Sequence, residues 1–322
     1  MATESAPGGL RGAGRAVIAV ALAVSACRGE LEPHLGAGVA APDPEVLLAA
    51  GARFELQLGD EPFALARAEI EDWIRDAALA VASYYGRFPV ARTTVRVRRV
   101  QGDGVGGGNT RAWDGSALIQ VELGEHASVE DLKEDWVLPH EMVHLALPGL
   151  PRQHHWLEEG IATYVEPVAR AQLGQLRVEE VWRQLVQGLP QGQPEPGDRG
   201  LDRTPTWGRT YWGGALFCLL ADVGIRERTG NRFGLRDALR AVVAGGHTML
   251  STSTMEELLA LCDEAAGVPV MSELYAAHAT EAVTVDLDLL WSRLGVSLRG
   301  RRIRFDDAAP LAAVRRAITA GE

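Results

Sequence analysis

The sequence predicts an α+β fold in which a small sheet and long helices are followed by a mainly helical lobe. Residues 54–58, 93–100 and 117–123 alternate apolar and polar side chains with the period expected of strands. Residues 61–85 carry an apolar stripe at helical spacing. From residue 211 onward, most long segments have the helical period, which indicates a mainly helical second lobe.

The amino terminus has the pattern of a secretory signal. Arg11 and Arg15 precede the apolar run 16–24, which is too short to cross a bilayer. The small residues before Cys27 resemble the signal of a bacterial lipoprotein, which implies cleavage before Cys27 and lipidation of that cysteine. The alternative is a simple signal peptide cut nearby. The resemblance implies a lipoprotein anchored in a membrane of the bacterial cell envelope, on its periplasmic or extracellular face.

The remaining organisation follows from composition and periodicity. Residues 1–26 are the predicted signal peptide, and the Gly-, Pro- and Ala-rich residues 27–45 are a predicted flexible tether. We expect an α+β metal-binding lobe over 46–187 and a mainly helical lobe over 188–322, ending in a hairpin and a helix. The formal net charge of −11 argues against a nucleic-acid partner.

The segment from His140 to His144 reads H-E-x-x-H within an apolar stretch predicted to be helical, residues 136–147. A spacing of four residues places both imidazoles on one helix face, where they can reach one ion. Glu141 lies beside the first histidine, where a carboxylate can take a proton from the attacking water. The other interpretation is an ordinary helix surface, but buried polar groups need partners, and a metal ion would supply them.

A second segment, residues 156–164, reads W-L-E-E-G-I-A-T-Y, and the predicted helix 156–170 contains it. The two segments together resemble the gluzincin zinc peptidases, in particular the aminopeptidase N and glycyl aminopeptidase families. The resemblance implies the catalytic domain of a thermolysin-like zinc peptidase with one Zn²⁺ per chain. It makes Glu159 the third zinc ligand, after His140 and His144. It also makes Glu166, two helical turns later, a carboxylate that orients a ligand histidine. Glu158 is expected to be solvated.

A third segment, residues 210–222, is similar to a helix of the same families that begins with a tyrosine. The resemblance implies that Tyr211 donates a hydrogen bond to the oxyanion of the reaction, which would supplement the metal. The alternative is a core aromatic residue at the start of an apolar helix.

The sequence also departs from these families. Fourteen residues separate His144 from Glu159, fewer than in aminopeptidase N-type enzymes, and no G-x-M-E-N motif lies upstream. The glycine-rich residues 106–115 occupy that region instead, followed by the strand 117–123, whose exposed edge could bind an extended peptide. Aminopeptidase specificity is therefore not favoured. His154 and His155 lie in the loop between the two motifs and are left outside the ligand set.

Two functions remain open. The first is an exported, lipid-anchored zinc metallopeptidase that hydrolyses peptide bonds of a peptide or protein substrate, with Glu141 as general base. The second is a non-catalytic envelope binding or assembly protein that keeps a zinc-stabilised peptidase fold. Because both histidines and the glutamate of the motif are intact, the first is favoured.

Overall fold

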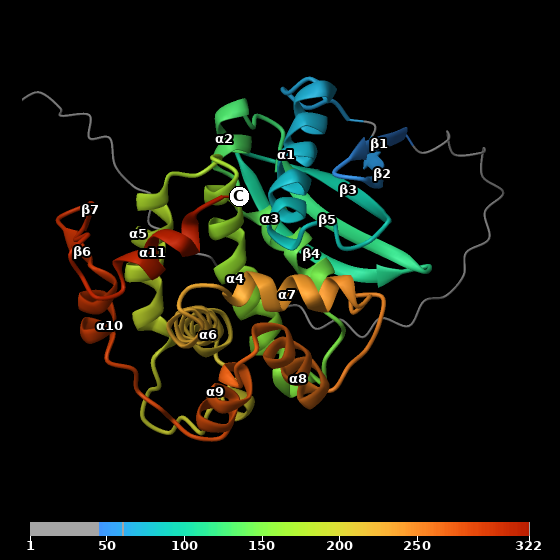
Figure 1. The fold of residues 1–322 in the computed structure, drawn as a ribbon. Helices are drawn as coiled ribbons and strands as arrows, with labels where there is room; N and C mark the ends of the chain where they lie inside the picture. Colours follow the sequence, from blue (N-terminus) through green and yellow to red (C-terminus); the bar gives the residue numbers. More distant parts are fainter. Residues whose placement is uncertain (1–44, 60, 322) are drawn as a thin grey trace, which may run out of the picture. The chain divides into compact units, whose positions relative to one another are not determined.

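The computed structural model describes residues 45–59 and 61–321. A mixed sheet of five strands forms one side of this part of the chain (Figure 1). The strand order is β1-β2-β3-β5-β4, and the strands are Glu45–Ala49 (β1), Ala52–Leu58 (β2), Arg92–Val100 (β3), Val105–Trp113 (β4) and Ser116–Gly124 (β5). The predicted strands 54–58, 93–100 and 117–123 are therefore confirmed, and β1 and β4 are additional.

The exposed edge of the sheet differs from the expectation. Strand β5 is an inner strand, parallel to β3 on one side and antiparallel to β4 on the other. The edge strand next to the H-E-x-x-H segment is β4. It could not be predicted from the sequence, because Gly106, Gly107 and Gly108 weaken the alternation typical of a strand. Any peptide that adds to this edge would pair with β4 rather than with residues 117–123.

Helix α1, Arg67–Tyr85, packs against the sheet and contacts α3 and α4 (Figure 1). Its apolar stripe is buried, with Ile74 and Val81 fully inaccessible to solvent. The helix begins six residues later than predicted, because Ala66 has an extended backbone and its N–H donates to the side chain of Glu69. The predicted helix itself is confirmed.

The two metal-binding motifs lie on neighbouring helices. A short helix α2, Val129–Glu134, leads into α3, Val137–Val143, which continues as the 3-10 turn His144–Ala146. After the loop, α4 runs over His155–Gln172 and packs against α1 and α3. These two helices correspond to the predicted helices 136–147 and 156–170.

The rest of the described chain is mainly helical, as predicted. The pattern missed α5 and α10, which are short amphipathic helices. The predicted hairpin is formed by β6 and β7, and the predicted terminal helix is α11. The elements are α5 (Val178–Gly188), α6 (Gly214–Thr229), α7 (Leu235–Ala244), α8 (Met255–Ala266), α9 (Val270–His278), α10 (Leu287–Leu294), β6 (Val296–Arg299), β7 (Arg302–Phe305) and α11 (Ala312–Thr319).

The predicted signal peptide 1–26, the lipidation site Cys27 and the tether up to residue 44 lie outside the described residues. Glu45, the last residue of the predicted tether, instead begins strand β1. Among the described residues, no helix has both the length and the apolar character needed to span a bilayer.

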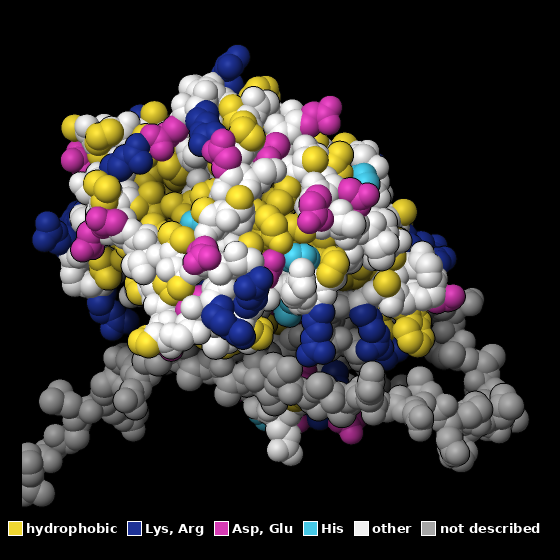
Figure 2. Space-filling model, turned by 90° about the horizontal axis from the view of Figure 1, so that it is seen from below, with side chains coloured by type: hydrophobic (Ala, Val, Ile, Leu, Met, Phe, Trp, Pro, Cys, Tyr) yellow, Lys and Arg dark blue, Asp and Glu magenta, His cyan; other side chains and the backbone are white. Residues whose placement is uncertain are grey.

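The surface is not uniformly polar. Figure 2 shows one face on which hydrophobic side chains fill the hollows, with charged side chains around them. Large exposed hydrophobic residues in the described part include Trp113, Trp207 and Phe233.

Candidate metal centre

Helices α3 and α4 bring together the three predicted ligands. The Nε2 atom of His140 lies 3.2 Å from Oε2 of Glu159, and Nε2 of His144 lies 3.6 Å from the same oxygen. One ligand atom from each residue lies within 4.8 Å of the other two. Two imidazoles and one carboxylate form the donor set of many catalytic zinc sites, which keep a fourth position open. These residues fit a zinc ion.

The charges of the site are coupled. Burial opposes ionisation of Glu159, but the charge of His144 and hydrogen bonds with both histidines hold the pKa of Glu159 well below its usual range. Burial also opposes protonation of His144, but Glu159, followed by Glu141, raises the pKa of His144 to about 9. The protein therefore surrounds this position with negative charge, which a divalent cation would neutralise.

Strand β4 contributes a hydrogen bond to Glu141, the predicted base on α3. The hydroxyl of Thr110 donates to Oε2 of Glu141 at 2.7 Å and lies 3.0 Å from the carbonyl oxygen of the same residue. Gly108, two residues earlier and on the same face of the strand, leaves room for this side chain. A Cβ atom at Gly108 would lie 2.7 Å from Cγ of Glu141. Thr110 could not be predicted from the sequence, because a single threonine in a glycine-rich run belongs to no motif with a recognisable spacing.

Tyr211 lies at the site, within a π-helical turn, Arg209–Gly213, that precedes α6. Such turns often occur at functional sites. Its ring is stacked near that of His140, with centroids 6.3 Å apart and planes 20° apart. Burial, then the carboxylates of Glu159 and Glu141, raises the pKa of Tyr211 above its usual range. The phenol therefore keeps its proton and can donate it in a hydrogen bond.

Glu166 is fully buried, and its carboxylate pairs with Arg170 one turn later on α4 at 2.7 Å. Burial raises the pKa of Glu166, while Arg170 and then the nearby His140 act in the opposite direction. Arg170 in turn donates to the carbonyl oxygen of Lys133 at the end of α2. The sequence did not suggest Arg170 as a partner of Glu166. The expected hydrogen bond from a ligand histidine to Glu166 stays a prediction.

The neighbouring loop residues make other contacts. His154 is buried against Asp202, with Nδ1 2.9 Å from Oδ1. Nδ1 of the exposed His155 lies 3.0 Å from Oε2 of Glu158, and its Nε2 lies 3.4 Å from Oε1 of Glu159. Glu158 also accepts the N–H of Leu150, so the expectation that Glu158 is simply solvated is wrong. The partners of Glu158 are thus Leu150, in the loop after α3, and His155, the first residue of α4.

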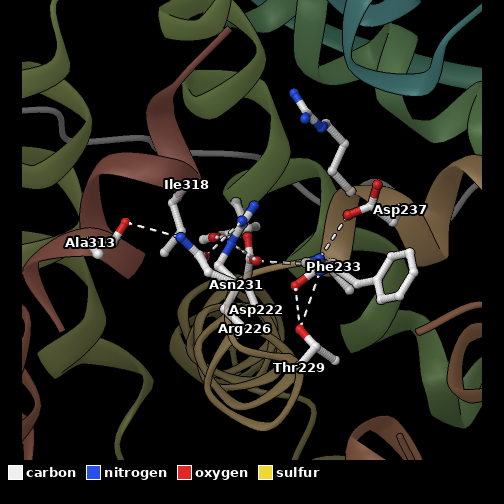
Figure 3. A network of polar contacts seen from close by, with 12 residues as sticks. Asp222, Arg226, Thr229, Asn231, Phe233, Asp237, Ala313 and Ile318 are labelled. Atoms are coloured by element: carbon white, nitrogen blue, oxygen red, sulfur yellow. Dashed lines mark hydrogen bonds and ion pairs between the residues drawn. The ribbon is translucent and has the colours of Figure 1, made fainter. Parts of the chain in front are cut away.

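The remaining motif residues hold α4 against α6. Gly160 and Gly214 lie where the two helices cross, and a Cβ atom at Gly160 would lie 2.4 Å from Cα of Gly214. The hydroxyl of Tyr164 donates to Asp222 at 2.8 Å, which joins the ends of the second and third motifs. Asp222 also pairs with Arg226 and accepts the N–H of Leu235, within the polar network of Figure 3. The helix that carries Glu159 is thereby fixed relative to the turn that carries Tyr211.

Comparisons with known proteins agree with this fold. No model of a protein family matches the sequence, and no curated protein matches it. The structure is similar to that of an aminopeptidase N family protein from Idiomarina loihiensis. Its TM-score is 0.60 and its identity 13%, and the match covers 80% of this chain and 49% of that one. A two-domain M1 zinc metallopeptidase with bound L-arginine gives a TM-score of 0.50 and 14% identity, over 75% of this chain and 52% of that one.

The chain thus spans about half the length of the solved structures that it matches. At 13% and 14% sequence identity, the similarity to these two structures shows a shared fold. The resemblance to gluzincin peptidases that the three motifs indicated is confirmed at this level: the chain has the fold of the zinc metallopeptidases of the aminopeptidase N family.

Proposed function

We propose that this protein is a gluzincin-type zinc metallopeptidase that hydrolyses peptide bonds. The observation that carries the proposal is the gathering of His140, His144 and Glu159 around one position. The buried Glu141 follows His140 directly in α3, and the ring of Tyr211 is stacked near that of His140, so both lie beside that position. A purely structural zinc site needs neither a base nor a hydrogen-bond donor of this kind.

His140, His144 and Glu159 would hold the metal. When bound, zinc would acidify water and polarise the scissile carbonyl. Glu141 takes a proton from the attacking water and passes it to the leaving amine, and Thr110 fixes the orientation of its carboxylate. Tyr211 donates its hydroxyl hydrogen to the oxyanion that forms at the carbonyl oxygen. Glu166, held by Arg170, keeps the ring of His140 in its ligating orientation.

The edge strand β4 supports a peptide substrate in extended conformation. Only β5 pairs with β4 in the described sheet, so the other side of β4 is open to a further strand. Thr110 of this strand contacts Glu141, so a peptide paired with β4 would pass close to the base. The M1 zinc metallopeptidase of similar fold, which binds L-arginine, is consistent with a substrate of this class. The arrangement of edge strand, α3 and α4 is the reason to expect the thermolysin-like catalytic domain.

The amino-terminal sequence supports an exported and lipid-anchored form of this enzyme. The apolar run 16–24 and the small residues before Cys27 are the basis for placing it in the bacterial cell envelope, on the periplasmic or extracellular face of a membrane. Labelling with a radioactive fatty acid, compared between the wild type and Cys27→Ser, tests this part. Equal labelling of the two proteins would contradict it.

The catalytic proposal is tested with Glu141→Gln. The variant should retain one zinc ion per chain, because Glu141 is not a ligand, and should lose hydrolysis of any peptide that the wild type cleaves. Zinc content is measured by plasma emission spectroscopy, and cleavage by mass spectrometry on a peptide library. Full activity of the variant would refute the mechanism. Stoichiometric zinc in a wild type that cleaves no peptide would favour a non-catalytic binding or assembly protein.

A further inference from the structure

The two faces of the five-stranded sheet differ in character. On the inner face, Phe54, Val95 and Ile119 are inaccessible to solvent, and Thr110 contacts Glu141 of α3. Side chains alternate along a strand, and residues paired across neighbouring strands point to the same side. The register therefore places the residues that alternate with the inner ones together on the opposite side of the sheet. We call this side the outer face.

Arginine dominates the charge of the outer face. Five arginines share it with only two acidic residues, Glu55 and Glu122; the arginines are Arg53, Arg92, Arg96, Arg98 and Arg111. Arg53 and Arg98 pair with the two glutamates. Arg96 donates to Gln57 of the same face. The outer face is therefore positive on balance, in a chain whose formal net charge is −11.

Exposed apolar side chains border these arginines on both edges of the sheet. Leu48 of β1 is 74% exposed and is paired with Arg53, and Trp113 of β4 is 52% exposed. The guanidinium of Arg111 lies over the indole of Trp113, 5.4 Å from its centre. Because β1 and β4 are the outermost strands, the arginines lie between two apolar borders. Arginine binds phosphate groups with two parallel hydrogen bonds, and tryptophan is enriched at the level of lipid headgroups.

The position of β1 brings this face close to the predicted lipid. Strand β1 begins at Glu45, the first described residue, and it carries Leu48. The sequence predicts a lipid on Cys27, and the 18 residue steps from Cys27 to Glu45 can span at most roughly 65 Å. The chain would thus hold the apolar border formed by β1 within that distance of the membrane, which raises the local concentration of the outer face at the bilayer.

We propose that the outer face docks on the anionic headgroups of the membrane that carries the protein. This inference goes beyond peptide hydrolysis and gives the proposed anchored form an orientation. The arginines meet lipid phosphates, while Leu48 and Trp113 reach the boundary of the acyl chains. The rest of the surface is acidic on balance and is repelled by the same headgroups. Glu141 and the metal ligands then lie on the side of the sheet that is turned away from the bilayer.

The test removes three exposed arginines from the outer face and compares the result with a matched control. The outer-face variant is Arg92→Gln/Arg98→Gln/Arg111→Gln. The control removes three exposed arginines from the hairpin of β6 and β7, which Figure 1 shows on the opposite side of the molecule from the sheet; it is Arg299→Gln/Arg301→Gln/Arg302→Gln. Both variants have the same net charge. Their thermal unfolding midpoints should stay close to that of the parent, because exposed charges contribute little to stability.

The parent is the full chain with Cys27→Ser, so no acyl chain contributes to binding. Lipid titrations with vesicles of phosphatidylcholine, with or without roughly one-third phosphatidylglycerol, give partition coefficients from flotation. The parent and the hairpin control should partition alike into anionic vesicles. The outer-face variant should partition roughly 10- to 100-fold more weakly, since each arginine near an anionic surface contributes about a factor of five. High salt should reduce this difference, and neutral vesicles should not show it.

Three results would overturn the docking face. One is a parent that does not prefer anionic over neutral vesicles. Another is an outer-face variant that partitions like the parent, which would mean that the arginines are simply solvated. The third is an equal loss in both variants, which would assign binding to net charge rather than to this face. None of these measurements involves cleavage or a lipid on Cys27, so the docking face can fail while the peptidase and the anchor stand, and the reverse also holds.

Discussion

The hydroxyl of Thr110 lies 2.7 Å from Oε2 of Glu141, so the edge strand of the sheet is hydrogen-bonded to the proposed base on the helix that carries His140. A hydrogen bond to a charged group contributes about 1.5–3 kcal/mol, and here it fixes where the carboxylate points. In the proposed mechanism, the strand with which a peptide substrate would pair therefore also orients the carboxylate that acts on that substrate.

Thr110→Val should lower kcat by roughly 10-fold and leave zinc content and KM nearly unchanged. The reason is that valine keeps the shape of threonine but cannot hold the Glu141 carboxylate, and about 1.4 kcal/mol corresponds to a factor of ten. Thr110→Ser, which restores a hydroxyl, should recover most of the activity. Steady-state kinetics with a cleaved peptide checks both variants. A Ser variant as impaired as the Val variant would contradict the role of the hydroxyl.

Glu159→Ala should be purified without zinc, since only His140 and His144 would remain as ligands. Glu158→Ala is the matched control, because Glu158 is adjacent on α4 but contacts His155 and Leu150 instead of the ligand set. It should retain zinc. Metal analysis after extensive dialysis measures the difference. Zinc in Glu159→Ala and none in Glu158→Ala would reverse the assignment.

Glu166→Ala should weaken zinc binding by about 10- to 100-fold without abolishing it. Loss of a carboxylate that orients a ligand histidine typically has this effect, and Glu166 is buried near His140. The variant also leaves the buried Arg170 without its acidic partner, so Arg170→Met is combined with it. Competition with a zinc chelator gives the affinities. If the double variant binds zinc as tightly as the wild type, Glu166 has no role at the metal.

Gly160→Ala should destabilise the fold by at least about 1–3 kcal/mol and lower zinc affinity as well. The new methyl group would lie 2.3 Å from the backbone of Gly214, so α4 and α6 would have to separate. Gly59→Ala is the control, because a Cβ atom there would meet no other atom within 4 Å. Urea unfolding compares the two proteins. Equal midpoints for both variants would mean that the helix crossing tolerates the change.

We expect the free energy of unfolding to decrease as the pH rises from about 4.5 to 7, because the buried Asp135 loses its proton over this range. Burial raises the pKa of Asp135 to about 6, and the N–H groups of Val137, Leu138 and Trp73 offset this only in part. Between the unfolded value of about 3.9 and this one, the folded state binds more protons, so its stability falls with rising pH. The effect is at most about 3 kcal/mol.

The measurement for Asp135 compares wild type and Asp135→Asn by thermal unfolding at several pH values, with chelator present so that metal binding does not contribute. The side chain of Asp135→Asn cannot titrate, and an amide nitrogen replaces one of the two oxygens that accept N–H groups. The wild type should therefore have its largest advantage at low pH, and that advantage should shrink toward pH 7. A constant difference across the range would show that Asp135 is ionised throughout.

The sequence, read with the family resemblance of its motifs, was enough to single out His140, His144 and Glu159, which the structure brings together, and to predict most of the helices. Four-residue spacing places His140 and His144 on one helix face whatever surrounds them, and this is a local property of helical geometry. The strands 54–58, 93–100 and 117–123 and the helix within residues 61–85 also follow from local periodicity, because each buries one face or both faces against a core.

Only the tertiary structure decided what surrounds those ligands. Strand β4 is recognisable only through its pairing with β5, since three glycines erase its pattern, and with it come Gly108 and Thr110 against Glu141. Tyr164 and Asp222 lie 58 positions apart and meet only because Gly160 and Gly214 let their helices touch. Such contacts depend on where distant segments pack, and local periodicity carries no information about that.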